Sequence, residues 1–369
     1  MGEQLVSNDE QDLRIVLASN LAELQAADHE WDVYAQLRSV KELQTKNGKP
    51  YLVVELADLH GVVEGKVWDN APTAMAATKE TEIGAIVKLR GKVKMWNEQT
   101  QIVIERLKAL EPGEQPEGFD LDQLIDPALQ SVEDLICGTL VFDIETVPAI
   151  DMRDLPATVA GALSDNAAKK DMDTAAVMGM SPFFGKVVSL AIGDGEAEPG
   201  SDAAQVTVLA VPPEGFEIDE CPPWLRLMSE PDLLRAFWAL AAKAECVVSY
   251  NGRGFDVPFL VARSMIHGIP ARVDLVSSKW SLRPHLDLFE LVTQRGRGPS
   301  KLDVVCWALG IESPKGVMDG SMVAPAYAAG EIVKIAEYNA HDVRATAEVY
   351  RKCRDMILRY RSDWAPNRK

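Results

Sequence analysis

The segment LVFDIET (residues 140–146) places two carboxylates inside a run of apolar residues. Such a run favours a buried strand, and residues two apart on a strand point to the same side. Asp143 and Glu145 therefore project together. Because an ionised carboxylate is very costly to bury alone, the pair predicts a strand end that faces cations or water. The alternatives are an exposed strand end and a structural salt bridge.

A further acid, Asp256, follows a tight glycine turn. The stretch CVVSY predicts a short buried strand, NGRG a turn, and FDVPFLVARSMIHG a helix. At the start of this helix Asp256 can either cap the helix or meet a metal. Asn251, in the turn, can either contact substrate or hold the turn.

The segment EYNAHDV carries Tyr338 and Asp342 four residues apart in a predicted helix over 331–353. That spacing puts both on one face. The Asp can hold a metal while the phenol reaches an attacking water. Free Tyr has a pKa near ~10 and is a poor base. A metal lowers the pKa of bound water to about 7, so Tyr338 need only orient that water or relay its proton. The alternative is a core tyrosine, and His341 points elsewhere on the helix.

In this order, the motifs resemble those of DEDDy 3′–5′ exonucleases, especially stand-alone relatives of the proofreading domain of family B DNA polymerases. The resemblance covers roughly residues 136–355, and PHLDLFELV, SKLDVVCWALGI and PKGVMDGSMV extend it. The sister DEDDh group has a His five residues before the last Asp. Glu337 stands there, which favours the tyrosine version. The resemblance implies an α/β RNase H-like catalytic domain with a mixed sheet.

The resemblance also implies a metal-dependent 3′–5′ exonuclease that releases nucleoside 5′-monophosphates from single-stranded ends. Two divalent ions, Mg²⁺ or Mn²⁺, would be held by Asp143, Glu145, Asp256 and Asp342, and Tyr338 would position the attacking water. DNA is the favoured substrate and RNA its rival, because nothing identifies a reader of the 2′-OH. A different class of function is a non-catalytic adaptor whose second domain only clamps nucleic acid.

Four charged residues between the second and third motifs could line the substrate channel, although for any one of them a solvated charge is the better interpretation. Lys315 is the one we predict to contact nucleic acid. The four are Asp287, Lys301, Lys315 and Asp319.

Residues 31–110 alternate like a small barrel. Five strands are expected at 31–43, 50–58, 62–70, 85–96 and 101–110, with a KNGK hairpin turn and a helical or loop insertion at 72–84. This order predicts an all-β OB-fold barrel. The stretch from Leu37 to Ala71 resembles nucleic-acid-binding OB domains of the anticodon-binding type.

Strand parity sorts the barrel residues into two faces. Leu52, Val54, Leu56, Val63 and Val67 are expected inside. Outward aromatics interleaved with cations suit a single-strand platform, since rings stack on bases and cations meet phosphates. The alternative is that Trp68 closes the barrel end and Trp96 packs on the second domain. The predicted nucleic-acid contacts of the barrel are Tyr34, Arg38, Lys66, Trp68, Lys94 and Trp96.

The expected organisation is therefore a partly disordered N-terminal segment at 1–30, an OB-fold domain at 31–110, a linker and helix at 111–135, and the exonuclease domain at 136–360. The linker is rich in Pro, Gly and Glu. Residues 151–181 interrupt the catalytic domain as a helical or partly mobile insertion. Such an insertion can be passive or can act as a lid.

Composition narrows the class of protein. At 369 residues and 47% hydrophobic, the chain can bury two ordinary cores. No apolar stretch approaches a membrane span, and the acidic N-terminus does not resemble a signal peptide, so we expect a cytoplasmic protein without membrane contact. The five cysteines are scattered and form no CxxC pair, which argues against a zinc site or a disulfide framework.

The net charge of −18 is unusual for a nucleic-acid binder, but it is unevenly distributed. Residues 31–110 hold 12 basic and 10 acidic residues, a net charge of +2. Part of the remaining acid belongs to the predicted metal site and would be offset by bound cations. The acidity argues against tight non-specific duplex binding, but it is compatible with a nuclease that handles strand ends.

Overall fold

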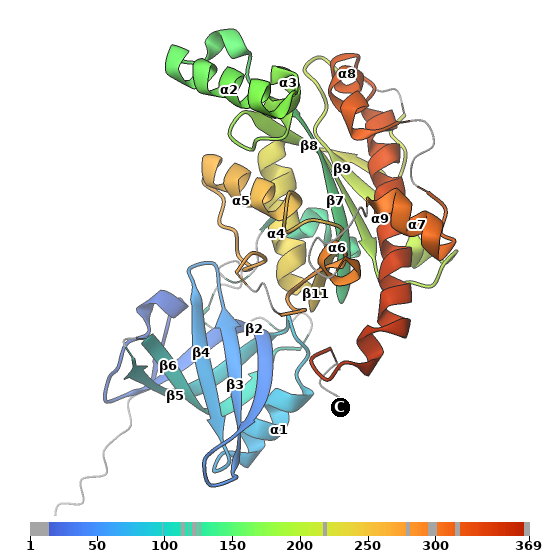
Figure 1. Cartoon of the computed structure of the whole chain (residues 1–369). Coiled ribbons are helices and arrows are strands. Elements are labelled where there is room, and N and C mark those ends of the chain that lie inside the picture. The colour runs from blue at the N-terminus through green and yellow to red at the C-terminus, as the bar shows by residue number, and fades with distance from the viewer. Residues whose placement is uncertain are drawn as a thin grey trace, which may run out of the picture. The chain divides into compact units, whose positions relative to one another are not determined.

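The structure is a computed structural model that describes residues 15–364, except 98, 112–113, 115, 117, 120–123, 125–126, 217–219, 278–280, 294–300 and 314–317. The chain divides into two compact units, Met1–Asp126 and Pro127–Arg368 (Figure 1).

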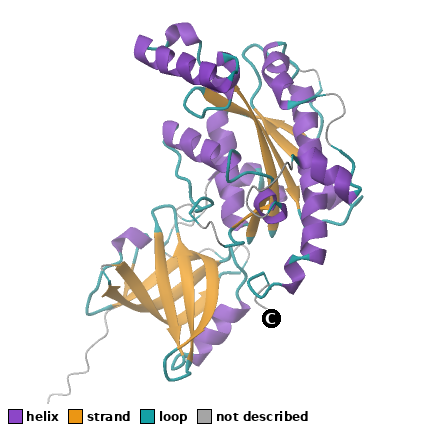
Figure 2. Cartoon of the chain, in the orientation of Figure 1, coloured by secondary structure: helices purple, strands orange, loops and turns teal. Residues whose placement is uncertain are grey.

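The first unit is a closed barrel of five long strands (Figure 2). Strand β2 pairs with β3 along one part of its length and with β5 along another, so the sheet closes on itself. The predicted OB-fold barrel is confirmed. Its strands are β2 (Glu30–Gln44), β3 (Pro50–Ala57), β4 (Val62–Trp68), β5 (Ile86–Trp96) and β6 (Gln99–Ala109).

Side chains at alternate positions fill the barrel. Leu52, Val54 and Leu56 are at most 1% exposed, as strand parity predicts. Gly65 lies among them because a Cβ there would come within 2.7 Å of the Val54 and Ile104 side chains. A side chain at this position of β4 would therefore force Val54 and Ile104 to shift in the close-packed interior.

Two shorter features complete the first unit. The insertion between β4 and β5 is helical, as one of the two alternatives expected, and forms α1 (Pro72–Glu80). A short strand, β1 (Ile15–Leu17), pairs parallel with β2, and η1 (Leu21–Glu23) follows it. Part of the segment expected to be disordered at 1–30 is thus ordered, while residues 1–14 lie outside the described range.

The second unit is built on a six-stranded sheet in the order β10-β9-β8-β7-β11-β12. Strand β8 runs antiparallel to both β7 and β9, and the other pairings are parallel. The predicted mixed sheet is confirmed. Its strands are β7 (Thr139–Pro148), β8 (Gly185–Asp194), β9 (Thr207–Ala210), β10 (Leu225–Leu227), β11 (Cys246–Ser249) and β12 (His285–Asp287).

Helices cover both faces of this sheet (Figure 1). On one face, Val141 and its neighbours pack with residues of α9 (Ile332–Met356) and α8 (Val323–Ala328). On the other, Phe142 packs against Phe237 of α4 (Glu230–Lys243), with ring centroids 4.9 Å apart. Successive residues of β7 thus point to opposite layers. The remaining helices are α5 (Asp256–Ile266), α6 (Leu288–Val292) and α7 (Leu302–Leu309), with short 3₁₀ turns η6 (Asp202–Ala204), η7 (Gly320–Met322) and η8 (Leu358–Tyr360).

In the described part of the helix expected before β7, the chain forms two 3₁₀ turns instead, η3 (Pro127–Ser131) and η4 (Glu133–Leu135). Proline lacks a backbone N–H, and its ring clashes with the carbonyl four residues earlier. Pro127 therefore begins η3 and prevents a helix from running through it.

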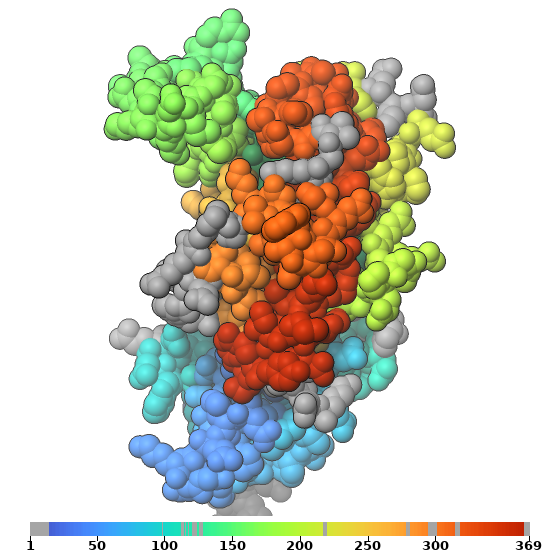
Figure 3. All heavy atoms as spheres, turned by 45° about the vertical axis from the view of Figure 1, so that its right-hand side comes forward, coloured from blue at the N-terminus to red at the C-terminus, as the bar shows by residue number. Residues whose placement is uncertain are grey.

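The insertion after β7 is a helical hairpin of α2 (Ala157–Lys170) and α3 (Thr174–Gly179), preceded by η5 (Met152–Asp154). Leu163, Ala167, Val177 and Met178 form a small apolar cluster of their own. The hairpin stands out as a separate green lobe of the second unit (Figure 3). Among the described helices of both units, none combines the length and apolarity needed to cross a membrane.

Candidate metal centre and nucleic-acid surface

Three carboxylates from two elements converge on one face of the sheet. Asp143 and Glu145 come from β7 and Asp342 from α9, and each offers an oxygen within 4.8 Å of the others. The three side chains are only half-buried. Residues 199 apart in sequence meet because α9 packs on the face to which the alternate residues of β7 point.

Asp256 lies beside this cluster and is 4% exposed. Its Oδ1 accepts a hydrogen bond from the backbone N–H of Ile144, with the two atoms 3.2 Å apart. It is the first residue of α5, after the cap residue Phe255. This hydrogen bond therefore joins α5 to β7 at the residue between Asp143 and Glu145.

The pKa values of Asp143, Glu145 and Asp256 are all raised by burial, and the charge of Asp342 contributes to each rise. Burial, followed by the charges of its three acidic neighbours, raises the pKa of Asp143 well above its usual value. Burial and the charges of Asp342 and Asp256 do the same to the pKa of Glu145. Burial also raises the pKa of Asp256 to about 7, although hydrogen bonds from backbone amides oppose the rise. A divalent cation would relieve this repulsion, and hard carboxylate oxygens suit Mg²⁺ or Mn²⁺.

Tyr338 lies one helical turn before Asp342 and is half-buried. Burial raises the pKa of its hydroxyl, and so do the charges of Asp342, Glu145 and Asp143 and a hydrogen bond with Asp342. The phenol therefore keeps its proton at neutral pH. It can orient a water or relay a proton but cannot act as a phenolate base. His341 and Glu337 are exposed.

Asp287 has a different place from the one expected. We considered a residue of the substrate channel or a solvated charge, but Asp287 is 4% exposed and its carboxylate accepts from backbone amides. Oδ1 accepts from the amides of Asn251 and Phe289, both at 2.9 Å, and Oδ2 accepts from that of Arg253 at 3.0 Å. Asp287 thus holds the turn that precedes Asp256. The spacing of charged residues contains no signal for this role.

The other residues of the turn and channel are placed as follows. Asn251 has a φ of 65°, and its carbonyl accepts from the amides of Gly254 and Phe255. Its backbone therefore holds the turn.

Of the other channel candidates, Lys301 is the exposed cap residue of α7, and Asp319 caps η7 by accepting from the amide of Ser321. Lys315 lies outside the described residues.

The helical hairpin is tied to β7 directly beyond Glu145. The hydroxyl of Thr146 donates to the carbonyl of Gly179 in α3 at 2.8 Å, and the amide of Ala149 donates to the carbonyl of Phe184, also at 2.8 Å. The hairpin is therefore anchored at its base on both sides.

On the barrel, the expectation that Tyr34 is an outward platform residue is wrong. Tyr34 is 5% exposed, and its ring stacks on Phe119 with centroids 4.7 Å apart. Strand parity puts Tyr34 on the outer face of β2, but residues beyond the barrel cover that part of the face. Arg38 is half-buried beside a β-bulge.

The remaining predicted barrel contacts are accessible. Trp96 is 63% exposed and Lys94 is exposed. Trp68 is half-buried and stacks on Tyr51, with ring centroids 4.8 Å apart and planes 23° apart. Lys66 is half-buried on the same face.

Cross-strand register extends this set to residues that sequence reasoning missed. Five residues on neighbouring strands are directly paired in succession, so they share the outer face. They are Lys41 on β2, Val53 on β3, Lys66 on β4, Val103 on β6 and Lys92 on β5. We call their lysines the cationic row: Lys41, Lys66 and Lys92. Next to it, Leu43, Tyr51 and Trp68 are paired across β2, β3 and β4. We call them the aromatic row. The alternation of residues along β3 could have identified Tyr51 as an outward aromatic residue. The two rows could not be found this way, because they depend on which residues of neighbouring strands pair.

Comparisons with known proteins agree with both folds. Residues 225–363 match the family described as a predicted 3′–5′ exonuclease related to the exonuclease domain of PolB. Residues 31–110 match the family described as an OB-fold nucleic acid binding domain. The chain joins an OB-fold domain to a PolB-related exonuclease-like domain. The matched part of the exonuclease-like domain contains Asp256, Tyr338 and Asp342, while Asp143 and Glu145 lie upstream of it.

Solved structures similar to the chain include the family B DNA polymerase of the archaeon Pyrobaculum calidifontis, at 15% identity and a TM-score of 0.42. That match covers 87% of this chain and 46% of the polymerase. The OB-fold domain is similar to the second OB-fold domain of replication protein A from Methanococcus maripaludis, at 20% identity and a TM-score of 0.22. That match covers 27% of this chain and 100% of the other. The mitochondrial single-stranded DNA binding protein Rim1 of S. cerevisiae is also similar (17%, TM-score 0.20, 22% of this chain and 95% of that one).

Proposed function

We propose that the chain is a metal-dependent 3′–5′ exonuclease that degrades single-stranded nucleic acid to nucleoside 5′-monophosphates. The observation that carries the proposal is the convergence of Asp143, Glu145 and Asp342 within 4.8 Å, in a domain whose family is described as a predicted 3′–5′ exonuclease. Carboxylates this close repel one another, and a divalent cation bound between them would offset that repulsion.

Asp143, Glu145 and Asp342 would hold two Mg²⁺ or Mn²⁺ ions, with Asp256 beside them. When bound, the ions would neutralise the phosphodiester and lower the pKa of water. Tyr338, which keeps its proton, would orient the attacking water from one turn along α9. Asp287 would keep Asp256 in place through the turn at 251–253.

The OB-fold domain would bind the single strand that the metal centre cleaves. Stacking on Tyr51, Trp68 and Trp96 does not depend on sequence, because every base has a π-face. The cationic row would meet phosphates, and Lys94 adds a further cation at the exposed hairpin. We favour DNA as the substrate, with RNA as its rival.

An end-labelled single strand incubated with the purified full chain tests the proposal. With Mn²⁺ we expect a ladder shortening from the 3′ end and release of 5′-monophosphates, and with EDTA no cleavage. The same strand as RNA decides the substrate. Binding without cleavage in Mn²⁺, Mg²⁺ and EDTA alike would overturn the nuclease and leave the adaptor as the function.

A further inference from the structure

A third row of side chains borders the cationic row on the side away from the aromatic row. Its members are paired in succession across the same five strands: Ser39 on β2, Glu55 on β3, Glu64 on β4, Gln101 on β6 and Lys94 on β5. Two exposed carboxylates, Glu55 and Glu64, therefore stand directly opposite each other on neighbouring strands. We call this pair the acidic pair. Like charges in directly opposite positions are destabilising, so this placement has a cost to the sheet.

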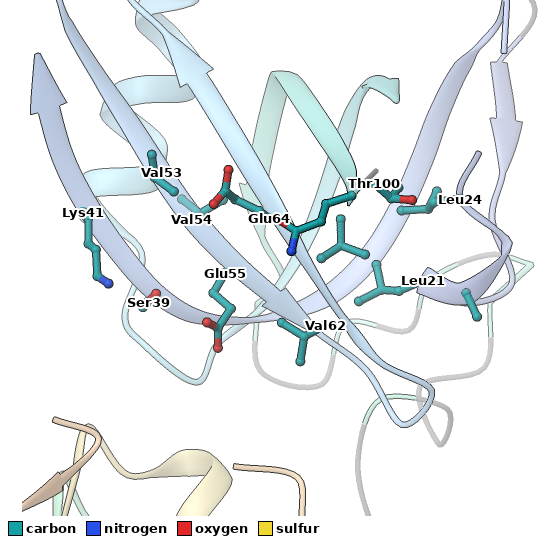
Figure 4. Close-up of a pocket in the computed structure, with 13 residues that line it drawn as sticks. Leu21, Leu24, Ser39, Lys41, Val53, Val54, Glu55, Val62, Glu64 and Thr100 are labelled. Carbon is teal, nitrogen blue, oxygen red and sulfur yellow. The ribbon is translucent and has the colours of Figure 1, made fainter. Parts of the chain in front are cut away.

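The acidic pair forms part of the wall of a pocket of about 600 Å³ on the barrel. Figure 4 shows Lys41, Glu55 and Glu64 among the residues around it. The apolar part of the wall comes from the turn after β1 and from β3 and β4, and includes Leu21, Leu24, Val53, Val54, Val62 and Val63. A hollow of this kind, with Lys41 in its wall, would otherwise be open to an extended polyanion.

The acidic pair also acts on the lysine nearest to it. Glu64 Oε1 lies 3.5 Å from Lys66 Nζ and accepts from Gln101 Nε2 at 2.7 Å. Lys66 Nζ in turn donates to Gln101 Oε1 at 3.1 Å. Lys66 thus has two partners, Glu64 of the acidic pair and Gln101. A phosphate that binds Lys66 must compete with Glu64.

We propose that Glu55 and Glu64 form an electrostatic barrier that keeps a single strand on the cationic and aromatic rows where it crosses β3 and β4. Residues two apart on a strand are about 7 Å apart, which sets the distance between neighbouring rows. Phosphates lying on the cationic row would have carboxylates about 7 Å away on one side and aromatic rings on the other. The backbone is excluded from the pocket, and the bases turn toward Tyr51 and Trp68. This inference rests on the proposed function of the OB-fold domain.

The barrier has a measurable consequence, because its removal should strengthen binding. At about 7 Å the repulsion between a carboxylate and a phosphate is only partly screened at physiological salt. Replacing both acids by amides of the same shape removes that repulsion and frees Lys66 from Glu64. We expect Glu55→Gln with Glu64→Gln to lower the Kd for a single strand about three- to tenfold.

The experiment measures the Kd of the full chain for a fluorescent oligo-dT by anisotropy in EDTA, where the strand stays intact. The matched control is Glu80→Gln with Glu82→Gln. These two acids are also exposed on the first unit and give the same change in net charge, but they lie at the end of α1 and in the segment after it. Thermal unfolding checks that both variants are folded.

Stronger binding by the double Gln variant than by the control, abolished when Lys41 and Lys66 are also replaced by Ala, supports the barrier. A Kd equal to that of the control, or a higher one, overturns it. If the wild-type chain does not bind oligo-dT at all, the proposed role of the OB-fold domain fails, which is a different result from the loss of the barrier alone.

Discussion

The carboxylate of Asp256 accepts a hydrogen bond from the backbone amide of Ile144, the residue between Asp143 and Glu145 in β7. This bond joins the N-terminus of α5 to the strand that supplies two of the clustered acids. It fixes the carboxylate of Asp256 beside the centre without using either neighbouring side chain. A fourth acid is thereby held close to three others, and the cost of this arrangement appears in the raised pKa of each acid on β7 and α5.

Asp143→Ala should abolish cleavage and leave the domain folded, because the residue serves to hold a cation. We expect the rate to fall by about 10³-fold or more, since metal ions supply several kcal/mol of transition-state stabilisation. Thermal stability in EDTA should be unchanged or higher, as one source of repulsion is gone. Normal turnover of the purified variant at saturating Mn²⁺ would show that this cluster is not the metal centre.

Tyr338→Phe keeps the ring and removes only the hydroxyl. If the phenol orients the attacking water, the rate should fall by about 10²–10⁴-fold, the range for general acid–base groups. Strand affinity and the stabilisation by Mn²⁺ should barely change. Single-turnover kinetics measure the chemical step directly. A near-normal rate would mean that Tyr338 only packs against the core of α9.

Asp287→Asn tests the residue that holds the turn before Asp256. The Asn amide has the same shape as the Asp carboxylate. Its NH₂ group would face backbone N–H groups that donate to the carboxylate in the native protein, so the turn should loosen. We expect activity to fall by about 10–100-fold, the usual cost of removing groups that orient metal ligands. The Mn²⁺ concentration for half-maximal activity should rise.

The control for that variant is Asp274→Asn. Asp274 also accepts two backbone amides, from Val276 and Ser277, but lies outside the turn that carries Asp256. Its variant should keep normal activity and metal dependence. An equal loss in the two variants would assign Asp287 a role in general stability only.

The stability of the metal-free protein should depend on pH through Asp256. Its pKa is raised to about 7, above the unfolded value near ~3.9, so the folded state binds more protons between these two values. The contribution of this group to stability is therefore greatest below about pH 4 and is lost as the pH rises to about 7. Added Mn²⁺ should raise the Tm more at about pH 8 than at about pH 5.

Thermal unfolding with EDTA or MnCl₂ at these two pH values measures the effect. Asp256→Asn should reduce the pH dependence in EDTA, because the amide has no proton to lose, while Asp143 and Glu145, whose pKa values are also raised, keep the rest of it. An identical Mn²⁺ shift at both pH values in the wild-type chain would contradict the assignment of these carboxylates to a metal site.

Local patterns in the sequence were enough to predict the elements on which the proposed site depends. Alternation identifies β7 and the interior of the barrel, because a strand has a period of two. The four-residue spacing of Tyr338 and Asp342 places them on one face of α9. Glycines and asparagine mark the turn before Asp256. These signals act over a few residues, and a chain segment carries them before any tertiary contact forms.

Only the tertiary structure decides what covers each face and which distant residues become neighbours. Periodicity puts Tyr34 on the outer face of the barrel but contains no information about Phe119, which stacks on it. The role of Asp287 depends on backbone amides 34 and 36 residues earlier. The cationic row and the acidic pair depend on strand register, which pairing and bulges set across the whole barrel. Contacts of this kind depend on how the segments pack, which the spacing of residues along the chain does not contain.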